Sequence, residues 1–167
     1  MMMFEAQTEW IAPDNFPDLS GYKLIAIDLE TRDPDLKSKG SGAVIGNGEI
    51  IGVAVAVDGW CKYYPFGHEG GGNLDKKRVL QWVKDICATE ATKIFHNAMY
   101  DVCWLRSYGI KINGHIMDTM VMASLVDENR MRYTLNALSW EYLGERKSEA
   151  TLFEIAKNWG IDPKAEL

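Results

Sequence analysis

The sequence predicts a single α/β domain built on a mixed β-sheet, and two observations support this fold class. Between residues 22 and 66, apolar runs rich in β-branched residues are separated by turn signals, which is typical of an antiparallel meander of three strands. From residue 73 onward, segments with helical periodicity alternate with short extended stretches. We therefore predict a sheet that begins as a three-strand antiparallel meander and has helices packed on it.

The composition is that of an ordinary soluble domain. The chain has 167 residues, 47% hydrophobic and 25% charged, and a chain of this length buries a sizeable core. It contains no charged segment leading into an apolar leader and no apolar run as long as a membrane span, which predicts no membrane partner. The net charge of -6 argues against an extended surface that binds duplex DNA non-specifically. It still allows a small site that holds a few phosphates through bound metal ions.

The cysteines do not form a recognisable metal or disulfide pattern. Cys61, Cys87 and Cys103 are odd in number and show no C-x-x-C spacing. Free thiols in a reducing compartment are the default for such a set, so we predict a cytoplasmic protein without a zinc site or a disulfide framework. The histidines likewise show no metal-ligand spacing.

The first part of the chain leads into the sheet. Residues 1–20 contain several turn and breaker residues and are predicted to be an irregular lead-in, with the domain itself covering residues 21–167. Residues 22–27 form an apolar run short enough for a buried strand, with two acids where it ends. Residues 31–48 are rich in glycine and charge and are expected to form a long loop directly after these acids.

A hairpin is expected next. Residues 49–57 are strongly strand-like, Asp58-Gly59 is a hairpin turn signal, and residues 60–66 form the returning strand. The glycine-rich segment 67–72 lacks the Lys-Ser/Thr pair of a phosphate-binding loop, so it is interpreted as a connector.

The rest of the chain is predicted to be mainly helical. Asn73 is expected to cap a helix over residues 74–89. The elements predicted after it are a strand over 92–96, a helix over 98–108 ended by Gly109, an extended segment over 110–117, and helices over 118–126, 134–143 and 151–159.

Two acids at the first strand suggest a metal site. Asp28 and Glu30 are two residues apart, so in a strand their side chains point to the same face, about 6.5–7 Å apart along it. They repel each other unless something positive lies between them, and a divalent cation with its preference for oxygen ligands is the simplest candidate. The alternative is that Asp28 begins a turn and Glu30 is solvated.

A second group of polar residues lies where the fourth strand gives way to a helix. Asn97 and Asp101 are four residues apart and stack on one helical face, with Tyr100 between them in sequence. Each also has a purely structural interpretation. Asp101 at a helix start gains a little from the helix dipole, Asn97 is a plausible N-cap, and Tyr100 supplies aromatic core surface.

The two groups together resemble the DnaQ-like 3′–5′ exonucleases, most closely the proofreading domain of family A (polymerase I-like) DNA polymerases. The likeness runs from about residue 22 to 167 and depends on Asp-Leu-Glu-Thr at 28–31 followed by Asn-Ala-Met-Tyr-Asp at 97–101. It extends to Leu-Arg-Ser-Tyr-Gly-Ile at 105–110, Met-Asp-Thr-Met at 117–120 and Tyr-Thr-Leu-Asn-Ala-Leu at 133–138. The resemblance implies a ribonuclease H-like fold.

The resemblance also implies a metal cofactor, two divalent cations that are Mg²⁺ or Mn²⁺. Asp28 and Glu30 would be ligands of the pair, with Asp28 bridging, and Asp101 would hold the second ion directly or through water. Two such ions orient an attacking water and stabilise the leaving 3′ oxygen in one in-line displacement.

Substrate contacts follow from the same likeness. Thr31 and Asn97 would hydrogen-bond the terminal nucleotide, and Tyr100 would pack on its base or sugar. Aromatic side chains of this kind hold single-stranded bases without reading sequence. Asp118 is a further acid nearby, but in the family this Asp-Thr pair mostly starts a helix, so capping is favoured over a direct site role.

One family motif does not occur in this chain. The family completes its site with Tyr-x-x-x-Asp or His-x-x-x-Asp, and no such motif that fits follows Asp101; Asp162 is preceded four residues earlier by Asn158. Either the chain is the N-terminal piece of a longer polymerase or exonuclease, or it is a complete but degenerate protein. A chain end directly before the expected motif favours the first, with a polymerase domain C-terminal in the full protein.

The leading hypothesis is a metal-dependent 3′–5′ exonuclease domain that acts on single-stranded DNA 3′ ends, in proofreading. An RNA exonuclease resembling ribonuclease D is the alternative, because the metal chemistry acts on the phosphodiester and only contacts to the 2′-OH separate RNA from DNA. A third hypothesis, motivated by the missing motif, is a non-catalytic module that binds a 3′ end.

Overall fold

The computed structural model describes residues 10–69 and 72–145. The chain divides into two compact units, Met1–Met122 and Ala123–Leu167. The first contains the sheet and every predicted site residue. The helix predicted over residues 151–159 lies outside the described residues, as do Asn158 and Asp162.

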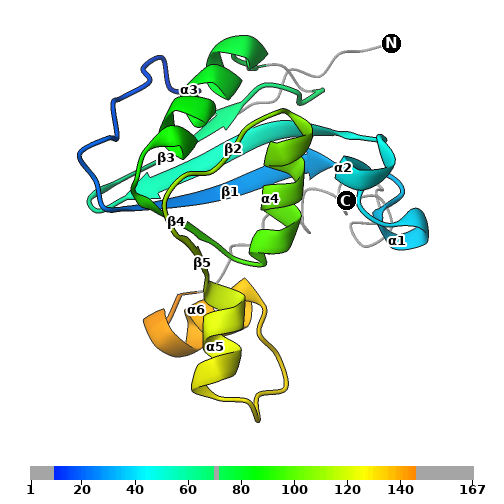
Figure 1. Ribbon diagram of the computed structural model, residues 1–167, viewed down its shortest axis with the longest axis vertical. Helices are drawn as coiled ribbons and strands as arrows, with labels where there is room; N and C mark the ends of the chain where they lie inside the picture. The colour runs from blue at the N-terminus through cyan, green and yellow to red at the C-terminus, as the bar shows by residue number, and fades with distance from the viewer. Residues whose placement is uncertain (1–9, 70–71, 146–167) are drawn as a thin grey trace. The chain divides into compact units, whose positions relative to one another are not determined.

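The described part of the first unit contains a five-stranded mixed sheet in the order β3-β2-β1-β4-β5. Its strands are β1 (Leu24–Arg32), β2 (Glu49–Val57), β3 (Trp60–Pro65), β4 (Thr92–Phe95) and β5 (Ile116–Asp118). The pairs β1–β2 and β2–β3 are antiparallel, and the pairs β1–β4 and β4–β5 are parallel. The predicted three-strand meander and mixed sheet are confirmed (Figure 1).

Four helices of the first unit are α1 (Leu36–Lys39), α2 (Gly42–Ile45), α3 (Lys76–Ala88) and α4 (Ala98–Ser107). Figure 1 shows α3 and α4 as the two long helices beside the strands. The buried side chains of α3 and α4 join one hydrophobic core with alternate residues of β1, namely Ile25, Ile27 and Leu29. Each such apolar side chain contributes about 1.5–3 kcal/mol when fully buried, so this core holds the helices to the sheet.

Strand β1 is longer than predicted. The predicted strand ended at residue 27, whereas β1 continues to Arg32, which pairs with Glu49 of β2. The polar residues that follow the apolar run stay extended because the long strand β2 supplies hydrogen-bonding partners for them. Asp28 and Glu30 therefore lie within the strand, and the interpretation of Asp28 as the start of a turn is wrong.

The N-cap of α3 also differs from the prediction. The helix begins at Lys76, and the side chain of Asp75 accepts a hydrogen bond from the Arg78 N–H. Asn73 instead forms two hydrogen bonds with the backbone of His68, at 2.8 Å and 2.6 Å. Both residue types are good caps, and the reciprocal contact with the loop decides between them.

A buried lysine in the short strand β4 holds this strand to its neighbouring segments. Lys93 is fully buried, and its ammonium group donates to the Thr89 hydroxyl at 3.1 Å and to the carbonyls of Ala91 and Asn113 at 2.9 Å and 3.0 Å, as well as to the Thr89 carbonyl. Burial lowers the pKa of Lys93. These bonds join the end of α3 to the segment before β5, so they position the strand that leads into α4.

The remaining segments match the predictions in type more than in extent. Of the extended segment predicted over residues 110–117, only β5 is a strand, and the predicted 31–48 loop contains the short helices α1 and α2. The predicted helix over 118–126 is α5 (Thr119–Val126). In the second unit, the predicted helix over 134–143 is α6 (Leu135–Leu143), capped by Thr134 and ended by Gly144 with φ 72°.

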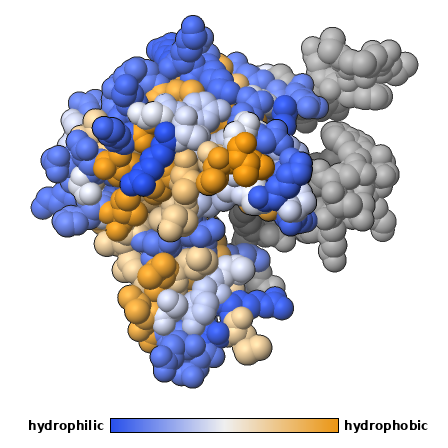
Figure 2. Space-filling view, turned by 45° about the vertical axis from the view of Figure 1, so that its right-hand side comes forward, coloured by the Kyte–Doolittle hydropathy of each residue, from blue (hydrophilic) through white to orange (hydrophobic). Residues whose placement is uncertain are grey.

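Among the described residues, none of the helices has the length and apolar character needed to cross a bilayer. The face in Figure 2 is mostly hydrophilic, with separate apolar patches. Apolar side chains that stand out from the surface include Val44 on α2 and Met99 on α4, which are 76% and 75% exposed. Both lie on elements that carry or adjoin the predicted site.

Candidate active site

Strand alternation places Asp28 and Glu30 on the face of β1 opposite the core. Both are exposed, whereas Leu29 between them is buried. Their partners on β2 are small, since Asp28 lies opposite Ala54 and Glu30 opposite Gly52. The pairing shifts between Glu30 and Thr31, a bulge that bends the strand directly after the second acid. The sheet therefore presents two carboxylates over a floor of small residues.

Helix α4 supplies a third carboxylate. Asp101 lies in its first turn with 3% exposure, and its Oδ1 accepts a hydrogen bond from the Leu29 N–H at 3.1 Å. Its carboxylate therefore lies against the backbone between the two strand acids. Burial raises the pKa of Asp101 to about 7; the bond from Leu29 opposes this shift, and the nearby charges of Asp28 and Asp118 add to it.

The three acids suit a divalent cation by type. All their donors are carboxylate oxygens, as Mg²⁺ and Mn²⁺ prefer. Burial is the main cause of the raised pKa of Asp101, and a cation beside its carboxylate would offset both the cost of burying its charge and the smaller repulsion from Asp28 and Asp118. In the described part of the chain, no three His, Cys, Asp or Glu side chains already form a group that could hold a metal ion. The three acids are near neighbours, and to bind one ion together their side chains must move closer to each other.

Asp118 is a helix cap, as predicted. Its carboxylate accepts from Met120 N at 2.9 Å and Val121 N at 3.4 Å at the start of α5. It also accepts from Asn97 N at 3.1 Å and Ala98 N at 2.8 Å at the start of α4. Burial acts to raise the pKa of Asp118, but these four N–H groups together lower it. Asp118 thus ties β5 to the start of the helix that bears Asp101.

Asn97 occupies the N-cap position of α4 in an unusual conformation. Its φ of 65° and ψ of 54° are left-handed, and it is the one non-glycine residue with positive φ in the described chain. Its side chain makes no capping hydrogen bond, because the carboxylate of Asp118 takes that role. Asparagine tolerates this conformation better than most residues, and local strain of this kind clusters at functional sites.

Thr31 and Tyr100 come together from β1 and α4. Their hydroxyl oxygens are 2.7 Å apart, and the Tyr100 hydroxyl also donates to Asp33 Oδ2 at 3.1 Å. The Tyr100 ring packs edge-on against Trp104. The structure therefore places two of the three predicted substrate contacts, Thr31 and Tyr100, in one hydrogen-bonded group beside the acids. Sequence reasoning missed Asp33, whose only signal is that it is a further acid in the loop after Asp28.

Tyr63 is a second neighbour that the sequence did not reveal. Its hydroxyl lies over Gly52, where an added Cβ would be 1.9 Å from that oxygen, and it is hydrogen-bonded to His68 Nε2. Burial, and then the charge of Glu30, raise the pKa of Tyr63 to about 12. The only signal in the sequence is a glycine inside a strand, which often marks a close approach by another group.

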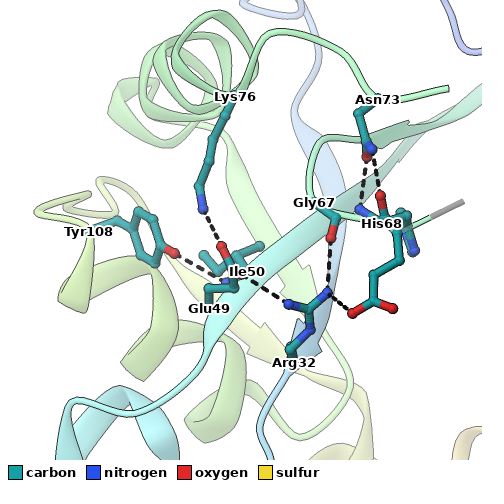
Figure 3. Close-up of polar contacts among 9 residues, drawn as sticks. Arg32, Glu49, Ile50, Gly67, His68, Asn73, Lys76 and Tyr108 are labelled. Carbon is teal, nitrogen blue, oxygen red and sulfur yellow. Dashed lines mark hydrogen bonds and ion pairs between the residues drawn. The ribbon is translucent and has the colours of Figure 1, made fainter. Parts of the chain in front are cut away.

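Polar contacts hold the loop after β3 to the end of β1 (Figure 3). Arg32 donates to the Gly67 carbonyl at 3.4 Å and forms ion pairs with Glu49 at 3.5 Å and Glu69 at 3.3 Å. Glu49 is also paired with Lys76 at 2.7 Å. These pairs are partly exposed, so each contributes at most about 1 kcal/mol. Together they place cationic side chains near the end of the strand that carries the acids.

Comparison with known families and proteins gives a consistent result. A family model described as 3′–5′ exonuclease matches residues 6–166. The DNA-directed DNA polymerase of Pseudomonas phage M6 is 35% identical over 172 residues, which cover 96% of this chain and 25% of that protein. The DNA polymerase DpoZ of Salmonella phage PMBT28 is 29% identical over 147 residues, which cover 87% of this chain and 21% of that protein. The chain thus spans about a quarter or less of these relatives.

Solved structures show the same fold. Brucella melitensis NrnC with bound Mg²⁺ superposes with a TM-score of 0.57 at 18% identity, over 83% of this chain and 61% of that one. Escherichia coli RNase D gives a TM-score of 0.55 at 15% identity, over 78% of this chain and 30% of that one. The predicted ribonuclease H-like architecture is confirmed.

Proposed function

This chain belongs to the 3′–5′ exonuclease family of family A DNA polymerases, and we propose that it removes nucleotides from single-stranded DNA 3′ ends in proofreading. The observation that supports this most directly is the position of Asp101. Its buried carboxylate lies against Leu29, between the two acids of β1. A buried acid beside two others is costly unless the site serves to bind positive charge.

In this proposal, Asp28, Glu30 and Asp101 hold two divalent cations, Mg²⁺ or Mn²⁺. When bound, the ions supply an activated water and stabilise the leaving 3′ oxygen. The protein's own part is to keep the three carboxylates on rigid elements. Asp101 is held by the Leu29 N–H, and the start of its helix is held by Asp118. Rigid placement of this kind is what phosphodiester hydrolysis requires of the protein.

The end of the substrate strand would lie beside the same residues. We propose that Thr31 and Asn97 hydrogen-bond the terminal nucleotide and that Tyr100 packs on its base or sugar. The exposed apolar side chains of Met99 and Val44 provide further surface for unstacked bases. None of these contacts reads a base edge, which suits an activity that must accept every sequence.

The test is shortening of a 5′-labelled single-stranded DNA by the purified chain with Mn²⁺ or Mg²⁺. We expect a ladder of products that grows from the 3′ end, and we expect Asp28→Ala to abolish it. Asp58→Ala is the matched control, because Asp58 is an exposed acid in the β2–β3 turn. Retained activity in Asp28→Ala would contradict the proposal, since Asp28 would be a metal ligand that no other side chain replaces.

The same assay separates the alternatives. An RNA exonuclease would degrade a matched RNA oligonucleotide faster than the DNA, because it would use the 2′-OH. A non-catalytic module that binds a 3′ end is the remaining candidate, and the missing third motif is what motivates it. That module would bind the oligonucleotide without turnover even with Mn²⁺ and excess protein. The phage relatives are DNA polymerases, so we propose a polymerase domain as the functional partner.

A further inference from the structure

We propose that Asp33 is a positioning residue that fixes the direction of the hydrogen bonds at the nucleotide-binding end of β1. Its carboxylate orients the Tyr100 hydroxyl, and the Tyr100 hydroxyl in turn makes Thr31 Oγ1 an acceptor toward the substrate. This inference rests on the proposed function only in that Thr31 and Tyr100 are taken to contact the terminal nucleotide.

Asp33 lies one residue beyond β1 and is partly buried. Its two carboxylate oxygens are 3.1 Å and 3.0 Å from the backbone nitrogen of Gly42. The second of them, Oδ2, is also 3.1 Å from the Tyr100 hydroxyl oxygen. A carboxylate offers only acceptors, so Gly42 and Tyr100 must both donate to it.

The direction of the next bond follows from proton count. A phenol has one proton, and Tyr100 gives it to Asp33. The contact of 2.7 Å between Tyr100 and Thr31 then requires the Thr31 hydroxyl to donate. Since Thr31 also has one proton, its oxygen can only accept any further hydrogen bond. A sugar hydroxyl at the 3′ end can donate that bond, whereas a phosphate oxygen cannot.

The Asp33 carboxylate also holds together the loop between β1 and β2, through its hydrogen bonds from the Gly42 N–H. A Cβ on Gly42 would lie 1.7 Å from the Asn47 carbonyl oxygen and 2.9 Å from Asp33 Oδ1, so only glycine allows this approach. A simple structural interpretation is therefore that Asp33 only holds the loop. The two roles differ in one respect, because a loop clamp has no reason to change which terminal group the site prefers.

Asp35 provides the matched control. It lies in the same loop, and its carboxylate accepts from Asn47 Nδ2 at 2.7 Å and pairs with Lys39 at 3.0 Å. It also bonds the Ser38 hydroxyl at 3.5 Å. These contacts stay within the loop, whereas Asp33 also reaches the group of Tyr100 and Thr31. Asp35→Ala therefore loosens the loop without removing the acceptor for Tyr100.

The experiment is equilibrium binding of a labelled single-stranded DNA to the whole 167-residue chain, with Ca²⁺ in place of Mg²⁺ to prevent turnover. One oligonucleotide ends in a 3′-hydroxyl and the other in a 3′-deoxy nucleotide. Loss of one hydrogen bond that leaves an acceptor unpaired corresponds to about fivefold in affinity. We expect wild type and Asp35→Ala to prefer the 3′-hydroxyl end by about this factor. We expect the preference to fall below about twofold in Asp33→Ala, Tyr100→Phe and Thr31→Val.

A double-mutant comparison makes the pathway explicit. If Asp33 acts through Tyr100, Asp33→Ala should have no further effect on the preference in a Tyr100→Phe background. The proposal is overturned if wild type binds the two ends equally, if Asp33→Ala keeps the preference, or if Asp35→Ala loses it to the same degree. Thermal unfolding of each variant identifies any variant that has lost its fold. The results for wild type and Thr31→Val do not depend on the loop that Asp33 holds, so they test the proposal even if Asp33→Ala fails to fold. A terminal preference in a chain that never hydrolyses DNA would contradict the proposed activity and leave the role of Asp33 intact.

Discussion

The buried carboxyl of Asp101 should make the metal-free protein less stable as the pH rises. Its pKa is raised from 3.8 to about 7, mainly by burial. In the unfolded chain the group releases its proton near the lower value, so between pH 4 and 7 folding must take up a proton. This contribution to stability is fully present below about pH 4 and is lost as the pH rises to about 7. The shift corresponds to a fall of up to about 4 kcal/mol in the free energy of unfolding.

Asp101→Asn removes this dependence, because the amide is neutral at every pH and its oxygen still accepts from Leu29. Urea unfolding in chelator from pH 4 to 8 should show wild type losing stability relative to Asp101→Asn. Asp85→Asn, on the exposed side of α3, should follow wild type. Added Mn²⁺ should restore stability at pH 7 in wild type and much less in Asp101→Asn. Parallel pH curves for wild type and Asp101→Asn would show that the Asp101 carboxyl does not cause the loss of stability.

Three further predictions concern the packing around the sheet and the binding of metal ions. Lys93→Met should lower the free energy of unfolding by about 3 kcal/mol in urea, since it leaves the Ala91 and Asn113 carbonyls without their buried donor; equal stability to the exposed control Lys77→Met would contradict this. Gly52→Ala should cost about 1–3 kcal/mol because its Cβ would meet the Tyr63 hydroxyl, whereas Gly21→Ala, with nothing within 4 Å, should be neutral by the same measurement. Calorimetric titration should show one readily occupied metal position and a weaker second one. Nuclease activity should be higher with Mn²⁺ than with Mg²⁺; full activity with Mg²⁺, equal to that of a chain extended by the third motif, would show that the site needs no further ligand.

Much of the fold follows from local patterns. The strongly strand-like run of β2 and the hairpin signal at Asp58-Gly59 predicted that strand and its turn with the bounds that the structure has. The end of β1 could not be predicted in the same way. Residues 28–32 are mostly polar, and they stay extended because residues 49–54 of β2 pair with them. The choice of Asp75 over Asn73 as a cap likewise depends on a contact between Asn73 and a loop backbone.

In the site too, local patterns predict some features, and contacts between distant residues decide the others. The period of a strand places Asp28 and Glu30 on one face, and family likeness adds Asp101. The burial of Asp101 and the hydrogen bond from Leu29 come from packing between α4 and β1, and the two residues are 72 apart in the sequence. The bond between Asp33 and Tyr100 joins residues 67 apart, and no local pattern encodes it. The sequence therefore predicts candidates for the chemistry, whereas the contacts that orient them are found only in the packing between distant segments.

We propose that Asp28, Glu30 and Asp101 together support metal-dependent cleavage at a DNA 3′ end. Single-turnover degradation of a 5′-labelled single-stranded DNA by excess protein with Mn²⁺ tests it most directly, because excess protein compensates for weak binding. We predict stepwise loss of 3′ nucleotides by wild type and by Asp58→Ala, and a rate lower by at least about a thousandfold in Asp28→Ala. An Asp28→Ala chain that cuts as fast as wild type, or a wild-type chain that binds the DNA and leaves its 3′ end intact, would contradict the claim.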